Sequence, residues 1–218
     1  MRTRERGTVA TAALLKKIFV PAFVAAAIAA AAPAANAGLV SGITNALLPT
    51  CGSNSQPFAQ FGDYNSYYAV PNNGLENGST GWSLGAGSSV GSGNEPFFVN
   101  GWGSHSLVLG PGSNAYSPAA CINLLDPDLR AFAHSNGANS ALRIQVIFYG
   151  LTGNLLGVLN VADQQPDDFA TWQPTGTVLS ALAVPLLTTS FRVRFTSLAT
   201  SGTWQVDDLF VDPWGSRG

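Results

Sequence analysis

Lysine is nearly absent from this sequence of 218 residues, where it occurs only at Lys16 and Lys17. The cations beyond residue 17 are five arginines: Arg130, Arg143, Arg192, Arg194 and Arg217. Binding to nucleic acid or to an anionic membrane surface needs clustered cations, so this scarcity argues against both partners. Histidine is also rare, and neither His105 nor His134 has the spacing of a metal ligand or a credible nucleophile beside it.

The sequence also lacks an apolar run long enough for a comfortable membrane span. Its longest run, residues 18–32, follows a basic start and precedes Ala35-Asn36-Ala37, an A-x-A cleavage pattern. We therefore expect residues 1–37 to be a signal peptide and the mature protein to be secreted, with no membrane span; an uncleaved anchor is the alternative. Cleavage after Ala37 would leave five cations and eleven acids, a net charge of −6.

Cysteine is limited to Cys51 and Cys121. In an exported chain two cysteines favour a disulfide bond over two free thiols. Residues 38–50 are an apolar stretch that serves either as a spacer or as one helical turn on the domain. Residues 51–218 are long enough for one domain, which we expect to be monomeric. Abundant glycine and few strong helix formers favour an all-β fold.

Short runs of alternating or apolar residues, separated by Gly, Pro, Asn and Asp, predict a β-sandwich. The predicted strands are a short one from Trp82 and residues 88–90, 97–99, 107–109, 116–122, 129–134, 141–149, 155–161, 171–178, 191–196 and 202–213.

The last of these strands, GTWQVDDLFVDP, holds two adjacent carboxylates among apolar residues. By the two-residue period of a strand, Asp208 shares a side with Trp204, and Asp207 shares a side with Leu209 and Val211. Burying such acids is costly without a partner. We expect Asp208 to point to solvent, and we leave open for Asp207 a metal or buried partner against simple exposure.

Several of these segments resemble a known family in their order along the chain. They are Leu75-Glu76, Gly81-Trp82-Ser83, residues 142–149, the strand with Trp172, and the segments FRVRF and WQVDDLFVD. Together they look like carbohydrate-binding modules of the galactose-binding-like jelly-roll type, closest to the cellulose- and xylan-binding group. The chain also resembles small secreted actinobacterial proteins whose activity is unassigned. The resemblance implies a jelly-roll β-sandwich of two antiparallel sheets.

The resemblance also implies a structural Ca²⁺ that joins the first strand to the last, with Glu76 and Asp207 as its acidic ligands. Gly74, Asn77 and Gly78 would present backbone carbonyls beside Glu76, and Ca²⁺ needs 6–8 oxygen ligands. In the alternative interpretation, Glu76 is a solvated turn residue and Asp207 caps the end of a strand.

A glycan-binding face should combine aromatic rings with planar polar groups, because sugars present apolar CH faces and hydroxyls. Strand parity places Arg143, Gln145 and Tyr149 on one face, and Arg192 and Arg194 on another. These two sets form one platform if the strands are neighbours. Trp102, in a glycine-rich loop, is the exposed aromatic candidate, although it could fold back over the sandwich.

We therefore expect a non-catalytic module that binds an extracellular glycan or cell-wall polymer. A protein-interaction domain of the same fold is the first alternative. A small hydrolase is the second, because glycosidases use paired carboxyls. The paired aspartates are Asp126/Asp128, Asp167/Asp168 and Asp207/Asp208. The first two pairs adjoin proline and are typical of turns.

Overall fold

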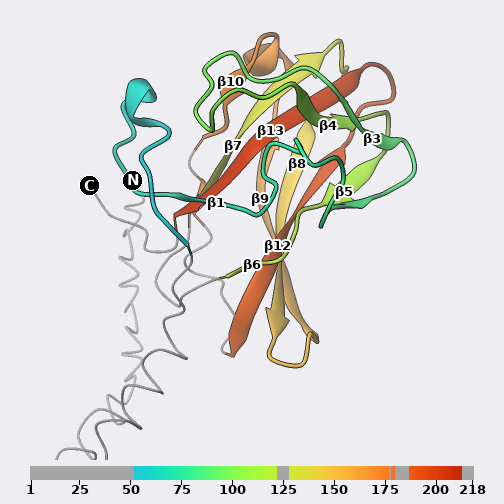
Figure 1. Ribbon diagram of the computed structural model, residues 1–218. Coiled ribbons are helices and arrows are strands. Elements are labelled where there is room, and N and C mark those ends of the chain that lie inside the picture. The colour runs from blue at the N-terminus through green and yellow to red at the C-terminus, as the bar shows by residue number, and fades with distance from the viewer. Residues whose placement is uncertain (1–51, 122–127, 177, 180–186, 213–218) are drawn as a thin grey trace, which may run out of the picture. The chain divides into compact units, whose positions relative to one another are not determined.

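The computed structural model describes residues 52–121, 128–176, 178–179 and 187–212. These residues form a jelly-roll β-sandwich of two antiparallel sheets, which confirms the predicted fold (Figure 1). The strands are β1 (Tyr68–Ala69), β2 (Ser83–Leu84), β3 (Ser88–Ser92), β4 (His105–Leu109), β5 (Asn114–Tyr116), β6 (Ala120–Cys121), β7 (Asp128–Asn136), β8 (Leu142–Gly150), β9 (Leu155–Gln164), β10 (Gln173–Pro174), β11 (Val178–Leu179), β12 (Thr188–Ser197) and β13 (Thr203–Asp212). Two 3₁₀ turns, η1 (Ala59–Phe61) and η2 (Pro166–Phe169), complete the described elements.

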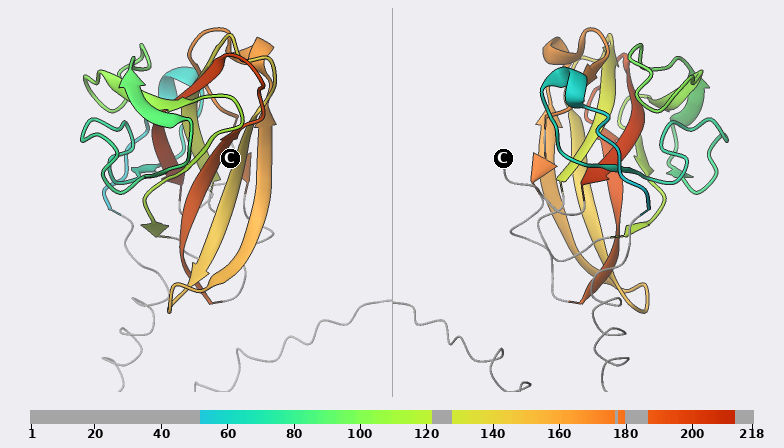
Figure 2. Two further views of the ribbon diagram at one scale, coloured as in Figure 1. Left: turned by 90° about the vertical axis from the view of Figure 1, so that its right-hand side faces the viewer. Right: turned by 60° about the vertical axis from the view of Figure 1, so that its left-hand side comes forward.

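One sheet has the strand order β10-β7-β13-β4-β3, with β1 also paired to β13 and β11 to β7; we call it the β13 sheet. The other has the order β2-β5-β12-β8-β9, with β6 also paired to β12; we call it the β12 sheet. Figure 2 shows the sandwich from two further sides. Within these ranges, no helix has the length and apolar character that crossing a membrane would require.

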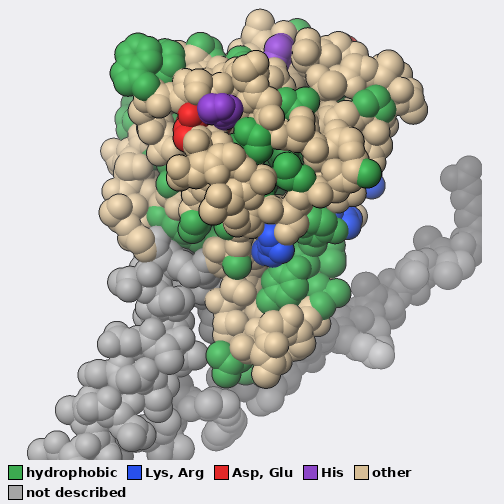
Figure 3. Space-filling view, turned by 45° about the vertical axis from the view of Figure 1, so that its right-hand side comes forward, with side chains coloured by type: hydrophobic (Ala, Val, Ile, Leu, Met, Phe, Trp, Pro, Cys, Tyr) green, Lys and Arg blue, Asp and Glu red, His purple; other side chains and the backbone are tan. Residues whose placement is uncertain are grey.

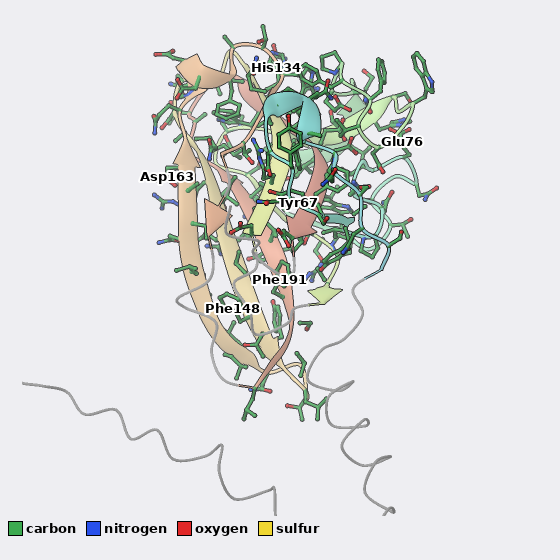
Figure 4. The ribbon with its side chains drawn as sticks, turned by 90° about the vertical axis from the view of Figure 1, so that its left-hand side faces the viewer. Tyr67, Glu76, His134, Phe148, Asp163 and Phe191 are labelled. Carbon is green, nitrogen blue, oxygen red and sulfur yellow. The ribbon has the colours of Figure 1, made fainter. Side chains whose placement is uncertain are left out.

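The main core fills the space between the two sheets, as the alternation of β8, β12 and β13 predicts. Phe148 of β8 pairs with Phe191 of β12, and both rings are almost fully buried (Figure 4). Trp204 of β13 is also buried in this core, and its indole nitrogen donates to the Ser140 carbonyl at 2.9 Å. Inward residues of long strands from both sheets therefore supply the apolar burial that stabilises the sandwich.

A second apolar cluster covers the outer face of the β13 sheet. Phe132 belongs to it, while its neighbours Ala131 and Ala133 face the main core, so Phe132 points to the opposite side. The cluster consists of Phe58, Tyr67, Phe132 and Phe210, with Phe61, Phe97, Val99 and Trp172 packed against it. The outer face of this sheet is therefore a buried surface.

An N-terminal arm, residues 52–67, supplies part of this cover and is fastened by polar contacts. Arg130 of β7 pairs with Asp63 at 2.6 Å, and the Tyr67 hydroxyl donates to the same carboxylate at 2.8 Å. The Arg130 guanidinium also lies 4.5 Å from the centre of the Phe58 ring. Burial raises the pKa of Asp63, but hydrogen bonds from Tyr67 and Arg130 outweigh it and hold that pKa below its ordinary value.

A β-bulge in β13 overturns the expected positions of its two acids. Asp207 lies opposite Phe132, whereas Phe210 lies opposite Arg130, so three steps on β13 match two on β7. Asp208 has the positive φ of 48° at this point. The extra residue reverses the parity of the strand. As a result Leu209 joins the main core although Asp207 faces outward, and the two do not share a side as expected.

The expectation that Asp208 points to solvent is also wrong, because only 3% of the residue is exposed. Three of the shorter predicted strands differ as well. Residues 97–99 lie in a loop, where Phe97 and Val99 cover the outer cluster. The described parts of segments 116–122 and 171–178 contain only short pieces of strand, in keeping with Pro118 and Pro174, which lack the N–H group that a ladder needs.

Several predictions fall on residues outside the described ranges. They concern the signal peptide 1–37, the spacer 38–50, Cys51, Asp126 and Arg217. Cys121 lies in β6, but its side chain is not described. The disulfide bond between Cys51 and Cys121 therefore stays a prediction.

Candidate functional site

The outer face of the β12 sheet brings together the predicted polar side chains of β8 and β12. These strands are neighbours, with Gln145 opposite Arg194 and Arg143 opposite Thr196. Core residues alternate with the polar ones along both strands, so the polar set lies on the opposite side from the core. We call this surface the arginine face. Its members are Arg143, Gln145, Tyr149, Arg192 and Arg194, with Tyr116 from β5 and Asn160 and Asp163 from β9.

One half of the arginine face is neutralised by side-chain pairing. Arg143 forms a bidentate ion pair with Asp163, with Nε–Oδ1 and Nη2–Oδ2 distances of 2.8 and 2.7 Å. The hydrogen bond from this guanidinium lowers the pKa of Asp163 from its ordinary value. Gln145 next to it donates to Asn160. These contacts link β8 to β9 and leave little charge on that side.

The other half of the arginine face holds two guanidinium groups close to the ring of Tyr116. Arg192 and Arg194 lie on the same side of β12, and their Cζ atoms are 5.9 and 5.8 Å from the centre of the Tyr116 ring. Arg194 donates to Gln145 Oε1 at 2.5 Å and to the Tyr116 hydroxyl at 3.3 Å. Figure 3 shows arginine side chains spaced along the surface beside apolar ones. Such a platform offers hydrogen-bond donors and an aromatic ring together.

Trp102 does not join this face. It lies in the loop of residues 93–104, between β3 and β4, and is 89% exposed. Its ring contacts that of Phe98, with a centroid distance of 4.4 Å. Phe97 and Val99 of the same loop pack on the outer cluster of the β13 sheet. The structure therefore places Trp102 on the side of the other sheet, away from the predicted partners on β8 and β12.

Three acids gather where this loop meets β13. They are Glu95 of the loop and Asp207 and Asp208 of the strand, and we call them the acidic cluster. Their exposed fractions are only 0%, 1% and 3%. The Glu95 N–H donates to Asp207 Oδ2 at 3.0 Å, and the Asp208 N–H donates to Asp207 Oδ1 at 2.9 Å. The Glu95 carboxylate accepts hydrogen bonds from the N–H groups of Phe97 and Val99. The cluster thus ties the loop to the bulge of β13.

Burial perturbs the ionisation of both aspartates. Burial, with repulsion from Asp208, raises the pKa of Asp207 to about 8. Burial, with repulsion from Glu95, raises the pKa of Asp208 to about 7. In the described residues, no lysine, arginine or histidine forms an ion pair with these three carboxyls. A buried group of carboxylates without a cation is unfavourable when ionised.

The space in front of the two aspartates depends on a glycine. A Cβ atom on Gly74 would lie 2.9 Å from Asp208 Oδ1 and 3.4 Å from Asp207 Oδ1. The same point is 3.9 Å from the amide nitrogen of Asn100. The Gly74 backbone thus passes so close to both aspartates that any side chain at this position would crowd them. Leu75, next to Gly74, has a positive φ of 57°, a strained conformation of the kind that accumulates at functional sites.

The donor chemistry of this place suits Ca²⁺, which binds carboxylate, amide and backbone oxygens. Among the residues that the structure describes, no three His, Cys, Asp or Glu side chains are already arranged to hold a metal ion. An ion here would therefore rely on amide or backbone oxygens in addition to the aspartates. Asp207 and Asp208 would hold it, and it would supply positive charge to a site that has none.

Glu76, the other predicted ligand, makes different contacts. Its carboxylate accepts the N–H groups of Ser104 and His105, both at 2.8 Å, and its Oε2 lies 3.1 Å from His105 Nδ1. The side chain is 40% exposed, and Figure 3 shows an acidic side chain at the surface beside a histidine. Glu76 therefore anchors the end of the loop. Among the described residues, none of its hydrogen bonds goes to Asp207.

Ser104, His105 and Glu76 do not form a catalytic triad. Ser104 Oγ and Glu76 Oε2 both approach the same ring nitrogen, His105 Nδ1, at 3.0 and 3.1 Å. A triad needs the acid and the nucleophile on different nitrogens of the histidine. The cluster therefore fixes the loop and does not activate the serine.

The sequence interpretation missed Glu95 and Tyr116. Glu95 sits in a turn-like Asn-Glu-Pro segment that carries no sign of burial. Tyr116 follows the alternation of β5, whose Ala115 faces the core, so strand parity would have assigned it to an outer face. The signal for Tyr116 was therefore present, whereas that for Glu95 was not.

No protein-family model and no curated protein matches this chain. The CBM22-1 xylan-binding domain of Paenibacillus barcinonensis Xyn10C is similar in structure, with a TM-score of 0.47, 13% identity, and coverage of 66% of this chain and 94% of that domain. TmCBM61, solved with β-1,4-galactotriose, has a TM-score of 0.41 and 13% identity, and the match covers 66% of this chain and 96% of that one.

The enzymatically active domain of tailspike protein 4 from bacteriophage CBA120 is also similar. The TM-score is 0.48 and the identity 16%, and the match covers 66% of this chain but only 21% of the tailspike chain. The similar structures thus include carbohydrate-binding modules and part of a larger protein. At these identities the likeness concerns the fold alone, so the function has to be argued from the sites.

Proposed function

We propose that this protein is a secreted, non-catalytic module that binds an extracellular glycan on the arginine face. The observation that carries the proposal is the Tyr116 ring with the guanidinium carbons of Arg192 and Arg194 at 5.9 and 5.8 Å from its centre, on the outer face of a sheet. The ring suits the CH face of a sugar, and the guanidinium groups suit its hydroxyls. The rigid strands below hold these groups in place without further ordering, which favours binding.

Binding of insoluble polysaccharides and of a glycan array by the secreted protein tests this proposal. Tyr116→Ala and Tyr149→Ala should weaken retention on a bound glycan, by about tenfold for Tyr116, which corresponds to about 1.4 kcal/mol. Trp102→Ala is the matched control, since this exposed ring lies on the side of the other sheet. A folded protein that binds no glycan, or loses binding only in Trp102→Ala, contradicts the assignment.

A protein-interaction domain is the second candidate, and the exposed pair of Phe98 and Trp102 favours it. These rings are 40% and 89% exposed and lie against each other. Exposed apolar groups of this size often mark contact surfaces. Binding that depends on Trp102 and not on Tyr116 would support this candidate.

A structural Ca²⁺ at the acidic cluster is part of the proposal. It is supported by the burial of both aspartates, which form no ion pair with a described residue, and by the close approach of the Gly74 backbone to their carboxylates. The ion would hold the bulge of β13 against the segment around Gly74. Glu76 keeps the predicted role of a ligand only if its side chain leaves Ser104 and His105.

A further inference from the structure

The described arginines differ in how their charge is compensated. Arg130 pairs with Asp63 at 2.6 Å, and Arg143 pairs with Asp163 at 2.7 Å. Within the described part of the chain, the hydrogen bonds of Arg192 and Arg194 go only to neutral groups. These groups are the backbone carbonyls of Ser117 and Gly81, the Ser83 hydroxyl, Gln145 and the Tyr116 hydroxyl. Two positive charges therefore remain on this half of the face.

The two charges are placed close together. Arg192 and Arg194 are separated by one residue on the same side of β12, and their Cζ atoms lie 5.9 and 5.8 Å from the centre of the Tyr116 ring. Like charges side by side on a strand repel each other. No hydrogen bond of Arg192 Nη1 or Arg194 Nη2 occurs with any described residue, so both groups keep N–H donors for a ligand.

The positive charge of this half of the arginine face also contrasts with the net negative charge of the rest of the protein. Residues 38–218 carry five cations and eleven acids. Asp163, the acid that the structure places on the arginine face, already forms an ion pair with Arg143. A ligand with negative charge would be attracted here and repelled over most of the remaining surface.

We propose that the glycan bound on the arginine face carries an anionic substituent, which Arg192 and Arg194 hold beside the Tyr116 ring. This inference rests on the proposed function and specifies its ligand class. The guanidinium fork matches the oxygens of a carboxylate, sulfate or phosphate group. The Tyr116 ring contacts the sugar that bears the group. Nucleic acid and membranes are disfavoured, because two unpaired cations on an acidic protein give weak phosphate binding.

Matched pairs of polymers that differ only in charge test the inference with the secreted protein. The pairs are polygalacturonate and its methyl ester, glucuronoxylan and unsubstituted xylan, and dextran sulfate and dextran. We expect at least one charged polymer to bind about tenfold more tightly than its neutral partner, as charge-assisted hydrogen bonds provide. The pair that shows the preference identifies the anion as carboxylate or sulfate. The preference should also fall as salt is raised.

Variants separate this inference from the proposed function. Arg194→Gln should abolish the preference for the charged polymer, and Trp102→Ala, on the side of the other sheet, should keep it. Arg192→Gln should behave like Arg194→Gln; circular dichroism checks its folding, because Arg192 also bonds the Ser117 carbonyl.

Equal binding of charged and neutral polymers, still sensitive to Tyr116→Ala, would overturn the inference and keep the proposed function. Binding of no polymer at all by the folded protein would overturn both. Stronger binding to vesicles of anionic lipid than to any charged glycan would also overturn the inference.

Discussion

The outer faces of the two sheets are built from similar strands but differ in how far they are buried. The face of the β13 sheet is covered by the N-terminal arm and the loop of residues 93–104, which bury aromatic rings and the acidic cluster. The arginines on the outer face of the β12 sheet are half-exposed, and Figure 3 shows arginine side chains at the surface. The alternation of a strand therefore assigns a side chain to a face, but only the neighbouring segments decide whether that face is buried.

Substitution of Phe132 should give the largest effect, because it belongs to the covered face. Phe132→Ala should lower the free energy of unfolding by about 3–5 kcal/mol, the usual cost of removing a buried ring. Tyr149→Ala on the open face should cost less than about 1 kcal/mol. Urea denaturation of both variants measures the difference. Similar losses in the two variants would show that the faces do not differ in burial.

The acidic cluster should make stability depend on pH and calcium. An acid whose pKa is raised by folding stabilises the fold while protonated, so this stability is lost as pH rises. For Asp207 and Asp208 the loss runs from their ordinary 3.8 to about 8 and about 7, respectively. In chelator, the melting temperature should therefore fall between pH 5 and about 8. Added Ca²⁺ should restore it at pH 8.

Asp207→Asn is the control for this experiment. It removes one buried charge and one proposed ligand, so the variant should show a weaker fall with pH and little response to Ca²⁺. Equal melting temperatures of the natural protein in calcium and in chelator at pH 8 would rule out the calcium site.

Gly74→Ala should have an intermediate effect. The added Cβ would lie 2.9 Å from Asp208 Oδ1, closer than such atoms normally approach. We expect a loss of about 1–3 kcal/mol, as for overpacking, and a diminished response to Ca²⁺. Gly176→Ala is the matched control, because no atom lies within 4 Å of its added Cβ. Thermal melts with and without calcium give both values, and equal behaviour of the two variants would contradict the role of Gly74.

Loss of the Arg143–Asp163 pair should have the smallest effect. Both partners are exposed, and exposed ion pairs contribute little to stability. Arg143→Gln should therefore leave the urea midpoint unchanged within error at physiological salt. A clear drop of the midpoint would mean that the open face also supports the fold.

Strand alternation in the sequence was enough to predict a β-sandwich and much of the arginine face, and the family resemblance added the jelly-roll type. The parities of β8 and β12 are uninterrupted over Arg143, Gln145, Arg192 and Arg194, so local pattern and structure agree there. The pairing of these strands, which the sequence left open, brings the two predicted sets together.

The features that the sequence did not predict depend on contacts between segments that are distant in the sequence. The bulge at Asp208 arises from the pairing of β13 with β7, and no local pattern signals it. Glu95 reaches Asp207 across 112 positions of sequence, so its burial follows from the path of a long loop. The sequence left Trp102 between an exposed position and one folded back over the sandwich; the residue is 89% exposed, and its sheet could not be assigned without that path.

The pairing of β1 with β13 has a mechanical consequence. Tyr68 lies opposite Val211 and Ala69 opposite Phe210, in antiparallel register, so the chain enters β1 and leaves β13 at the same end. Tension applied through these two ends would pull the strands apart sideways and break their hydrogen bonds one after another. The domain should therefore yield to a pulling force by unzipping from this ladder, at a lower force than if both strands had to slide past each other.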